Sequence, residues 1–426
     1  MSTLKAVRGT RDLLPPETAL WNRIEATARS VFARYNFGEI RTPIFEDTGL
    51  FARGVGEETD IVSKEMYTWE DRARAQSEKT QSLTLRPENT AGVVRAYIEH
   101  KLGETGQLQK LYYIGPQFRR ERPQKGRYRQ FSQIGAEVIG PASAGSESPI
   151  RDAEVLEMLA TLLDELGITG WTLHINSVGS TADRARYNET LREALVPLAP
   201  KMCADCQRRA VTNPLRVLDC KVPEDQPIID TLPRIADSLD EDSKTHFAAV
   251  IAALDAAGVP YSRNNRLVRG LDYYTRTTFE FTHGGLGAQN ALLGGGRYDG
   301  LSEAIGGPKA PGIGFAMGED RLVLTLQALE AAKPEKADAF IAPLGESMNP
   351  AALALARELR RAGLTVELGE GSFRLKKSFE VADKTARRIV ILGEDELQSG
   401  ILTVKDFATG TQTKVPRGEL AAVLTK

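Results

Sequence analysis

Cysteine and histidine are scarce in this sequence. Only three cysteines and four histidines occur among its 426 residues, and no histidine stands in a motif with serine, cysteine or a carboxylate. The sequence therefore offers no hydrolytic triad. It also contains neither an HExxH zinc motif nor the GxxxxGK[ST] loop that cradles phosphates. If a nucleotide binds, side chains must hold its phosphates.

Long hydrophobic runs are also missing. No uncharged apolar stretch approaches the roughly eighteen residues that a membrane span requires, and the N-terminus carries no signal-peptide core. We therefore expect a cytoplasmic protein with no membrane partner. A hydrophobic content of 41% and a charged content of 26% are typical of a globular chain, and the length predicts two or three domains.

The three cysteines lie close together in the chain. Cys203 and Cys206 form a CxxC pair, and Cys220 follows. A zinc site needs four ligands, usually a second CxxC or histidines at matching spacing, and the next histidine is His246. This pattern favours free thiols in a helical segment over a metal site, so no metal ligands are predicted.

Hydrophobic periodicity divides the chain into blocks. Residues 1–179 alternate short strand patterns with amphipathic helices, including one helix predicted to begin at Asp152 as N-cap. Residues 180–254 read as helical and resemble an insertion into a larger domain. In 255–329 strand signals return as a predicted antiparallel pair, followed by a glycine-rich turn before an apolar helix. After a polar linker, residues 335–426 alternate strand and helix on a mostly parallel sheet.

A basic stretch, QFRRERPQKGRYRQF (117–131), stands out because the whole chain has a net charge of only −2. Strand patterns on both sides of ERPQKG predict a hairpin. On such a hairpin Gln117, Arg119 and Glu121 share a face with Phe131, Gln133 and Glu137. The turn carries Arg122, Lys125, Arg127 and Arg129 outward. A solvated charged hairpin and a nucleic-acid contact both fit this pattern.

Three arginines are candidates for phosphate binding because a planar guanidinium meets two oxygens at once. They are Arg119, Arg269 in LVRGLDYY and Arg321 in GEDRL. In the same LVRGLDYY segment, two adjacent tyrosines on a strand would point to opposite faces. In LTLRPENTAG, Asn89 or Thr90 is suited to cap a helix.

Taken together, these segments resemble the histidyl-tRNA synthetase family of class II aminoacyl-tRNA synthetases. RGTRDLLP and IRTPIFEDTGLF resemble the N-terminal signature and motif 1. FRRERPQKGRYRQFSQIGAEVIG resembles motif 2, and GIGFAMGEDRLVL motif 3. LVRGLDYYTRTTFE and GGGRYDGL resemble the segments that separate the histidine enzymes from other class II members.

The resemblance implies an α+β fold: a catalytic domain on an antiparallel sheet, a helical insertion and a C-terminal α/β anticodon-binding domain. It implies ligation of L-histidine to tRNA(His) with ATP as substrate, Mg²⁺ bridging the phosphates, and a homodimer. Arg119 and Arg269 would act at the α-phosphate.

The resemblance also implies roles for further residues. The histidine site would comprise Glu88, Asn89, Thr90, Gln133, Glu137, Tyr273 and Tyr274. ATP would meet Arg119, Glu121, Phe131 and Arg321, and the tRNA acceptor end would meet the turn from Gln124 to Arg129. Asn89 stands where the family often has glycine, and Ser132 where histidine is common.

A non-catalytic alternative is a paralogue that acts as regulatory subunit of ATP phosphoribosyltransferase. That family typically lacks the C-terminal domain and parts of motif 2, both of which are present here. The C-terminal block contains a predicted basic helix, RLKKSFEVADKTARR, with the charge expected for contact with a phosphate backbone.

Overall fold

An eight-stranded sheet organises the larger part of the chain. The computed structural model describes residues 4–56, 59–71, 80–124, 126–286, 290–329 and 336–425, and the chain divides into two compact units, 1–332 and 333–426. The strand order is β1-β5-β6-β11-β10-β9-β7-β8. The two edge strands β1 and β8 pair in parallel with their neighbours, and all other pairs are antiparallel. The strands are β1 (Gly38–Glu39), β5 (Gln109–Phe118), β6 (Gln130–Ile139), β7 (Trp171–Ser177), β8 (Ser262–Arg263), β9 (Thr275–His283), β10 (Ala291–Arg297) and β11 (Gly312–Gly318).

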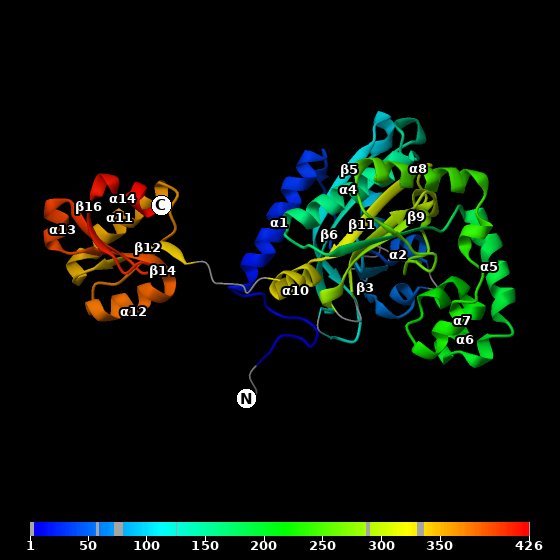
Figure 1. Ribbon diagram of the computed structural model, residues 1–426, viewed down its shortest axis with the longest axis horizontal. Helices are drawn as coiled ribbons and strands as arrows, with labels where there is room; N and C mark the ends of the chain where they lie inside the picture. The colour runs from blue at the N-terminus through cyan, green and yellow to red at the C-terminus, as the bar shows by residue number, and fades with distance from the viewer. Residues whose placement is uncertain are drawn as a thin grey trace. The chain divides into compact units, whose positions relative to one another are not determined.

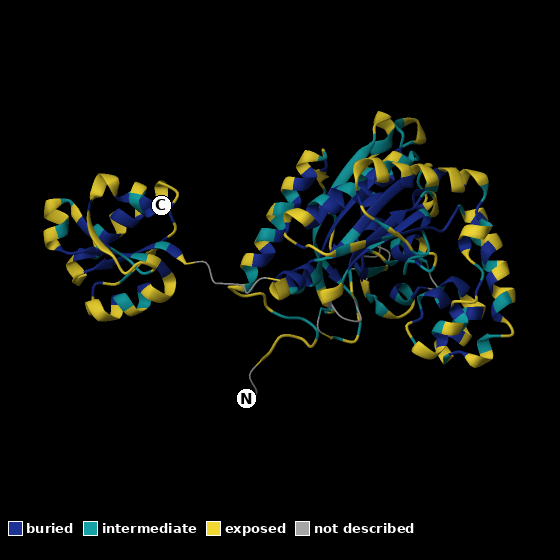
Figure 2. Ribbon diagram, viewed as in Figure 1, coloured by how far each residue is buried: buried dark blue, intermediate teal, exposed yellow. Residues whose placement is uncertain are grey.

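The two faces of this sheet differ because side chains alternate along each strand. One face carries large apolar groups such as Ile134, Phe279 and Phe315, and four helices cover it (Figure 1). Figure 2 shows the strands buried and the outer surfaces of these helices exposed. The opposite face carries glycine and polar side chains. The covering helices are α1 (Glu17–Arg34), α4 (Pro149–Glu165), α8 (Glu241–Ala257) and α10 (Glu319–Leu329).

Smaller elements flank the polar face. A three-stranded antiparallel sheet has the order β2-β4-β3, and it precedes helix α3. These elements are β2 (Phe45–Asp47), α2 (Thr48–Val55), β3 (Tyr67–Asp71), β4 (Gln81–Leu85), α3 (Thr90–Glu99) and α9 (Leu301–Ala304).

A helical segment with its own apolar core lies between β7 and α8. Its core runs from Val178 to Leu239, whereas α8 packs on α4 and shares the core of the large sheet. We therefore place the end of the insertion near Leu239 rather than at Leu254. Its helices are α5 (Thr181–Leu195), α6 (Ala204–Thr212) and α7 (Gln226–Ile229).

The second unit is a five-stranded sheet with helices on both faces. Its order is β13-β12-β14-β15-β16. The strands β12, β13 and β14 run parallel, but β15 and β16 pair antiparallel, so the expectation of a mostly parallel sheet is only half right. The elements are β12 (Ala337–Pro343), α11 (Asn349–Arg361), β13 (Val366–Leu368), α12 (Leu375–Thr385), β14 (Ala386–Leu392), α13 (Glu394–Ser399), β15 (Ile401–Asp406), β16 (Gln412–Pro416) and α14 (Leu420–Thr425). Residues 330–335 of the predicted linker lie outside the described residues.

Three local predictions are wrong. Helix α4 begins at Pro149, so Asp152 is not its N-cap; it lies buried in the first turn and forms an ion pair with Arg297. Segment 312–318 is strand β11, not a turn. The predicted antiparallel pair in 259–285 does not form, because β8 and β9 both pair with β7. In none of the described helices is there a stretch long and apolar enough to cross a membrane.

Candidate active site

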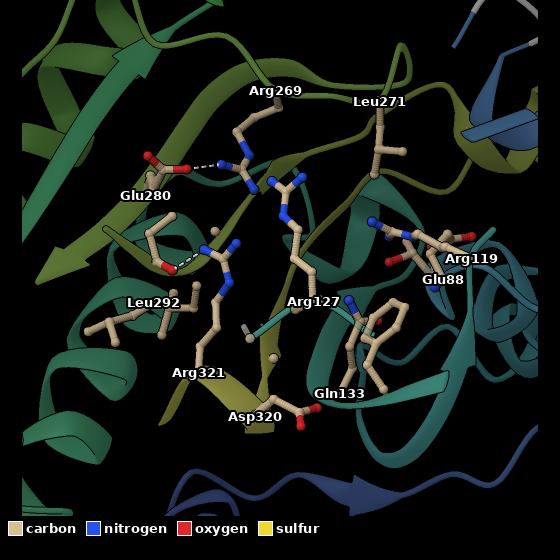
Figure 3. Close-up of a pocket in the computed structure, with 18 of the residues that line it drawn as sticks. Glu88, Arg119, Arg127, Gln133, Arg269, Leu271, Glu280, Leu292, Asp320 and Arg321 are labelled. Atoms are coloured by element: carbon tan, nitrogen blue, oxygen red, sulfur yellow. Dashed lines mark hydrogen bonds and ion pairs between the residues drawn. The ribbon is translucent and has the colours of Figure 1, made fainter. Parts of the chain in front are cut away.

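A cavity opens on the polar face of the large sheet. It is bordered by α3, the β5–β6 hairpin and the loop that precedes β9 (Figure 3). Ten predicted site residues line it: Glu88, Thr90, Arg119, Glu121, Phe131, Gln133, Arg269, Tyr273, Tyr274 and Arg321. Segments more than 200 residues apart in sequence thus meet at one site.

Glycines of β10 and β11 leave room for side chains at this cavity and behind it, and Gly294 lines the cavity. A Cβ at Gly294 would lie 2.4 Å from the guanidinium of Arg269. A Cβ at Gly314 would lie 1.6 Å from Glu137, and one at Gly296 would lie 2.8 Å from the ring of Tyr274. Distances this short are not possible between real side chains, so the glycines of β10 and β11 set the shape of the site.

A buried polar network lies at the end of the cavity beside α3. Both oxygens of Glu88 accept backbone N–H groups, from Thr90 at 2.7 Å and Ala91 at 3.0 Å. Thr90 in turn donates its hydroxyl to Glu137 at 2.7 Å, and Tyr298 donates to the other oxygen of Glu137 at 2.7 Å. Glu137 therefore lies behind the cavity lining and orients Thr90.

Burial perturbs both carboxyl groups of this network. It raises the pKa of Glu137 to about 8, and the nearby Glu88 adds to the shift while the Thr90 and Tyr298 hydroxyls oppose it. Burial also raises the pKa of Glu88, against its two backbone hydrogen bonds. Paired carboxyl groups with shifted pKa values are typical of functional sites rather than of ordinary surfaces.

The tyrosine pair is arranged differently from the prediction. Tyr273 and Tyr274 precede β9 instead of lying on a strand, and their ring centroids are 4.7 Å apart. Both line the cavity. Tyr298 packs edge-on against Tyr273 with centroids 5.9 Å apart. Three aromatic rings with hydroxyl groups therefore enclose the polar network.

Guanidinium groups gather at the other end of the cavity. Arg269 forms an ion pair with Glu280 at 2.5 Å, and Arg321 donates to the carbonyl oxygen of Ala291 at 2.6 Å. Arg127 points in beside them (Figure 3). Burial lowers the pKa of Arg321, and the charge of Arg127 lowers it further. Converging cations of this kind favour an anionic ligand.

Arg119 lies beside Glu88 (Figure 3), and its charge opposes the rise that burial causes in the pKa of that carboxyl group. Its Nε donates to the carbonyl oxygen of Pro87 at 2.9 Å, and its guanidinium lies 5.2 Å from the ring centroid of Phe131. Glu121 is 3.8 Å from Arg119 and 3.3 Å from Arg127. The ladder pairs Gln117 with Phe131, which confirms the predicted side-chain parity within the strands, whereas Arg119 and Glu121 lie beyond the end of β5.

Besides Glu137, three predicted residues do not line the cavity. The side chain of Asn89 accepts from the Thr42 hydroxyl at 2.6 Å and from Arg86 at 3.3 Å, and its φ of −120° is not left-handed. Arg129 donates its backbone N–H to Gly9 and a guanidinium N–H to Arg8. Gln124 is exposed at the hairpin turn, and Lys125 lies outside the described residues.

The helical segment braces the loop that carries Arg269 and the tyrosines. Arg184 on α5 donates to the carbonyl oxygens of Asp272 and Tyr274 at 2.8 and 2.6 Å. Arg216 donates to the carbonyl oxygen of Arg269 at 3.3 Å.

Sequence reasoning missed these contacts, and also Arg127, Glu280 and Tyr298. For Tyr298 its place in GGGRYDGL was the available signal, whereas nothing in the sequence marks Arg184.

Comparisons with known proteins agree with this arrangement. The chain is 73% identical to the histidine–tRNA ligase of Koribacter versatilis over 98% of this chain and 95% of the relative, and 57% identical to that of Solibacter usitatus over 99% of both. The apo histidyl-tRNA synthetase of S. aureus covers 100% of both chains with a TM-score of 0.79 and 38% identity. A synthetase structure from Nostoc sp. covers 99% of both with a TM-score of 0.73 and 21% identity. The fold is that of a class II aminoacyl-tRNA synthetase.

Family models narrow this class. The model described as Histidyl-tRNA synthetase matches residues 9–322, and the one described as Anticodon binding domain matches residues 338–426. The chain belongs to the histidyl-tRNA synthetase family.

Proposed function

We propose that this chain is a histidine–tRNA ligase, which activates L-histidine with ATP and transfers it to the 3′ end of tRNA(His). The observation that carries the proposal is one cavity with two chemically different ends. One end is a polar network of carboxyl and hydroxyl groups, and the other is a group of arginines. A small zwitterion and a triphosphate fit these ends side by side.

The polar end is suited to histidine. The carboxylate of Glu88 and the hydroxyl of Thr90 would receive the substrate's ammonium group. Gln133, Tyr273 and Tyr274 offer hydrogen bonds for the imidazole, with Glu137 holding Thr90 in place from behind. A site whose polar groups would be left unpaired by an apolar isostere can reject it by roughly 10⁴-fold or more.

The arginine end is suited to the phosphates of ATP. Arg119 and Arg269 would meet the α-phosphate, Arg321 the γ-phosphate, and Phe131 would stack on adenine. Arg127 adds a cation between Arg269 and Arg321, so we include it among the phosphate contacts. Asn89 is withdrawn from the substrate contacts because its side chain is bonded to Thr42 and Arg86.

The chemistry needs no enzymic nucleophile. A carboxylate oxygen of histidine attacks the α-phosphorus, the bond to the β-phosphate oxygen breaks, and pyrophosphate leaves. The 3′-terminal ribose hydroxyl of tRNA then attacks the acyl carbon, loses its proton, and AMP leaves. The residues contribute positioning and neutralisation of charge on the phosphate oxygens, which explains arginines without a triad.

Mg²⁺, when bound, would supply further charge neutralisation at the phosphates of ATP. The cavity lining contains Glu121 and Glu280 beside the arginines, and carboxylate oxygens are hard ligands of the kind that Mg²⁺ prefers. These two residues are therefore our candidates for holding it.

Partners beyond the small molecules follow from the same proposal. The acceptor end of tRNA would meet the hairpin turn at the exposed Gln124 and Arg122, since the Arg129 guanidinium is bonded to the N-terminal segment. A reaction that consumes ATP and tRNA supports a cytoplasmic location. We propose a homodimer through the motif 1 region, where Ile44, Phe45 and Trp69 are large apolar groups left exposed in the single chain. Sedimentation of the purified protein at the monomer mass would contradict the dimer.

Histidine-dependent exchange of radioactive pyrophosphate into ATP tests the function directly. We expect exchange with L-histidine and background rates with proline, threonine and glycine. Arg269→Ala should reduce exchange by orders of magnitude while the circular dichroism spectrum stays unchanged. Exchange with another amino acid would reassign the substrate, and no exchange with any would favour the non-catalytic regulatory paralogue.

A further inference from the structure

Three cysteines and one aspartate converge in the core of the helical segment. The Sγ atoms of Cys203 and Cys220 are 3.9 Å apart, and Asp225 Oδ2 lies 3.3 Å from Cys220 Sγ. With Cys206, one ligand atom from each residue falls within 4.8 Å of the others. Cys206, Cys220 and Asp225 are buried, and Cys203 is half-buried.

The Cys203–Cys220 and Cys220–Asp225 separations are close to those of a tetrahedral zinc site. Zn–S bonds of about 2.3 Å place two sulfur atoms about 3.8 Å apart, and a Zn–O bond of about 2.1 Å places sulfur and oxygen about 3.6 Å apart. Soft thiolates select zinc, iron–sulfur clusters or copper(I), while a carboxylate ligand in a tetrahedral set disfavours copper(I). Four protein ligands without an open position are typical of structural zinc.

The local backbone is already arranged to hold thiolates. The N–H of Cys206 points to Cys203 Sγ at 3.5 Å, and the N–H of Val222 points to Cys220 Sγ at 3.4 Å. Cys203 is also the N-cap of α6, where the helix dipole favours a negative sulfur. Neutral thiols would gain little from these contacts.

We propose that Cys203, Cys206, Cys220 and Asp225 bind one structural Zn²⁺ ion. The sequence pattern is C-x₂-C-x₁₃-C-x₄-D. Spacing alone favours free thiols because no fourth cysteine or histidine follows at zinc-site spacing. The fourth ligand is a carboxylate, which only the folded chain brings to the three sulfur atoms.

The site has a consequence for the cavity. The 3₁₀ turn Pro214–Asp219 ends at Cys220, and its Arg216 donates to the carbonyl oxygen of Arg269. A metal that ties Cys220 to α6 and to Asp225 therefore fixes the segment that braces the phosphate-binding loop. The helical segment has a small apolar core, and small cores commonly rely on such cross-links.

Metal analysis of the full-length protein tests the proposal. Protein purified without chelator and dialysed against Zn²⁺ should contain about one zinc per chain by inductively coupled plasma mass spectrometry. Replacement by Co²⁺ should give the thiolate charge-transfer band and the visible bands of a tetrahedral site.

Cys206→Ser and Asp225→Asn should reduce zinc content at least severalfold. The amide introduced by Asp225→Asn keeps an acceptor for the Cys203 N–H, so its effect reports on the metal and not on that hydrogen bond.

Asp205→Asn is the matched control, because Asp205 lies inside the CxxC loop but is exposed and pairs with Arg208. It should keep full zinc content. Wild-type protein without zinc after this loading, and with three thiols that react freely or with a Cys203–Cys220 disulfide, would overturn the proposal. These readouts do not depend on ligase activity, so the zinc site and the proposed function fail separately.

Discussion

At the scale of single residues, the glycines of β10 and β11 matter as much as the side chains they face. Gly294, Gly296 and Gly314 lie where any Cβ would collide with Arg269, Tyr274 or Glu137. Two further residues of the GGGRYDGL segment form buried contacts behind the cavity lining. Arg297 is fully buried in an ion pair with Asp152, and Tyr298 bonds Glu137.

Gly294→Ala should impair activation without unfolding the protein. The new methyl group displaces the Arg269 guanidinium, so we expect pyrophosphate exchange to fall at least tenfold, which corresponds to about 1.4 kcal/mol in the barrier. Gly300→Ala is the control in the same segment, since nothing lies within 4 Å of its added Cβ. Equal activities for the two variants would show that Gly294 is not needed to make room for Arg269.

Glu137→Gln should change how stability depends on pH. The folded protein holds the Glu137 proton up to about pH 8, whereas the unfolded chain releases it near its ordinary pKa of about 4.3. Wild-type stability therefore falls as pH rises through that window, by at most about 1.4 kcal/mol per pH unit from this group. Urea unfolding at pH 5 and pH 8 should show a smaller loss for the variant.

The exposed Glu104→Gln variant should follow the wild-type slope in the same measurement. A Glu137→Gln slope equal to that of the wild type would mean that Glu137 does not keep its proton in the folded state.

At the scale of elements, sequence patterns predict regular hairpins well and glycine-rich strands poorly. Alternation predicts which side chains of the β5–β6 hairpin share a face, and the ladder bears this out for Gln117, Phe131 and Gln133. Glycine is rare in strands, so the sequence predicts a turn at 312–318. The segment is a strand whose glycines make room for neighbouring side chains. Strand alternation predicts that Arg127 points outward. Arg127 lies in the turn, however, where contacts with the rest of the chain set the direction of a side chain.

The role of a residue cannot be predicted from its local sequence when it depends on a partner far away along the chain. The family resemblance implies a substrate contact at Asn89, but its side chain is held by Thr42, 47 residues away. The tyrosines before β9 favour a strand by their propensity. Arg184 of the helical segment holds that stretch as a loop instead.

Arg184→Ala should loosen this loop. Loss of two hydrogen bonds to the carbonyl oxygens of Asp272 and Tyr274 lets the tyrosine pair move, so we expect KM for histidine to rise about tenfold, with kcat less affected. Arg192→Ala on the exposed side of α5 is the control and should leave both constants unchanged. A raised KM for ATP alone would contradict the assignment of the loop to histidine binding.

At the scale of the whole molecule, the C-terminal unit supplies a second basic surface. Helix α12 exposes Lys376, Lys377 and Lys384, and its other side packs on the sheet through Ala382. Arg388 belongs to the predicted basic helix but lies in β14, where it bonds Asp406 at 2.8 Å. The basic surface is therefore smaller than the sequence suggests.

Replacing Lys376 and Lys377 by glutamine should weaken tRNA binding and flatten its salt dependence, by about one unit of slope per lost phosphate contact. Histidine activation without tRNA should not change. The control is Arg357→Gln with Arg361→Gln on α11, which contributes to the apolar core of the opposite sheet face. Loss of activation in the α12 variant would contradict a role confined to tRNA.

The contacts of Arg184 and Arg216 with the loop before β9 have a thermodynamic consequence. A ligand on the helical segment that shifts either arginine alters the free energy of this loop, which we propose receives the substrates. Linkage then requires reciprocity: histidine or ATP in the cavity must change the affinity of that ligand by the same factor. The affinity of such a ligand, measured with and without the small substrates, would therefore report on the hydrogen bonds of Arg184 and Arg216.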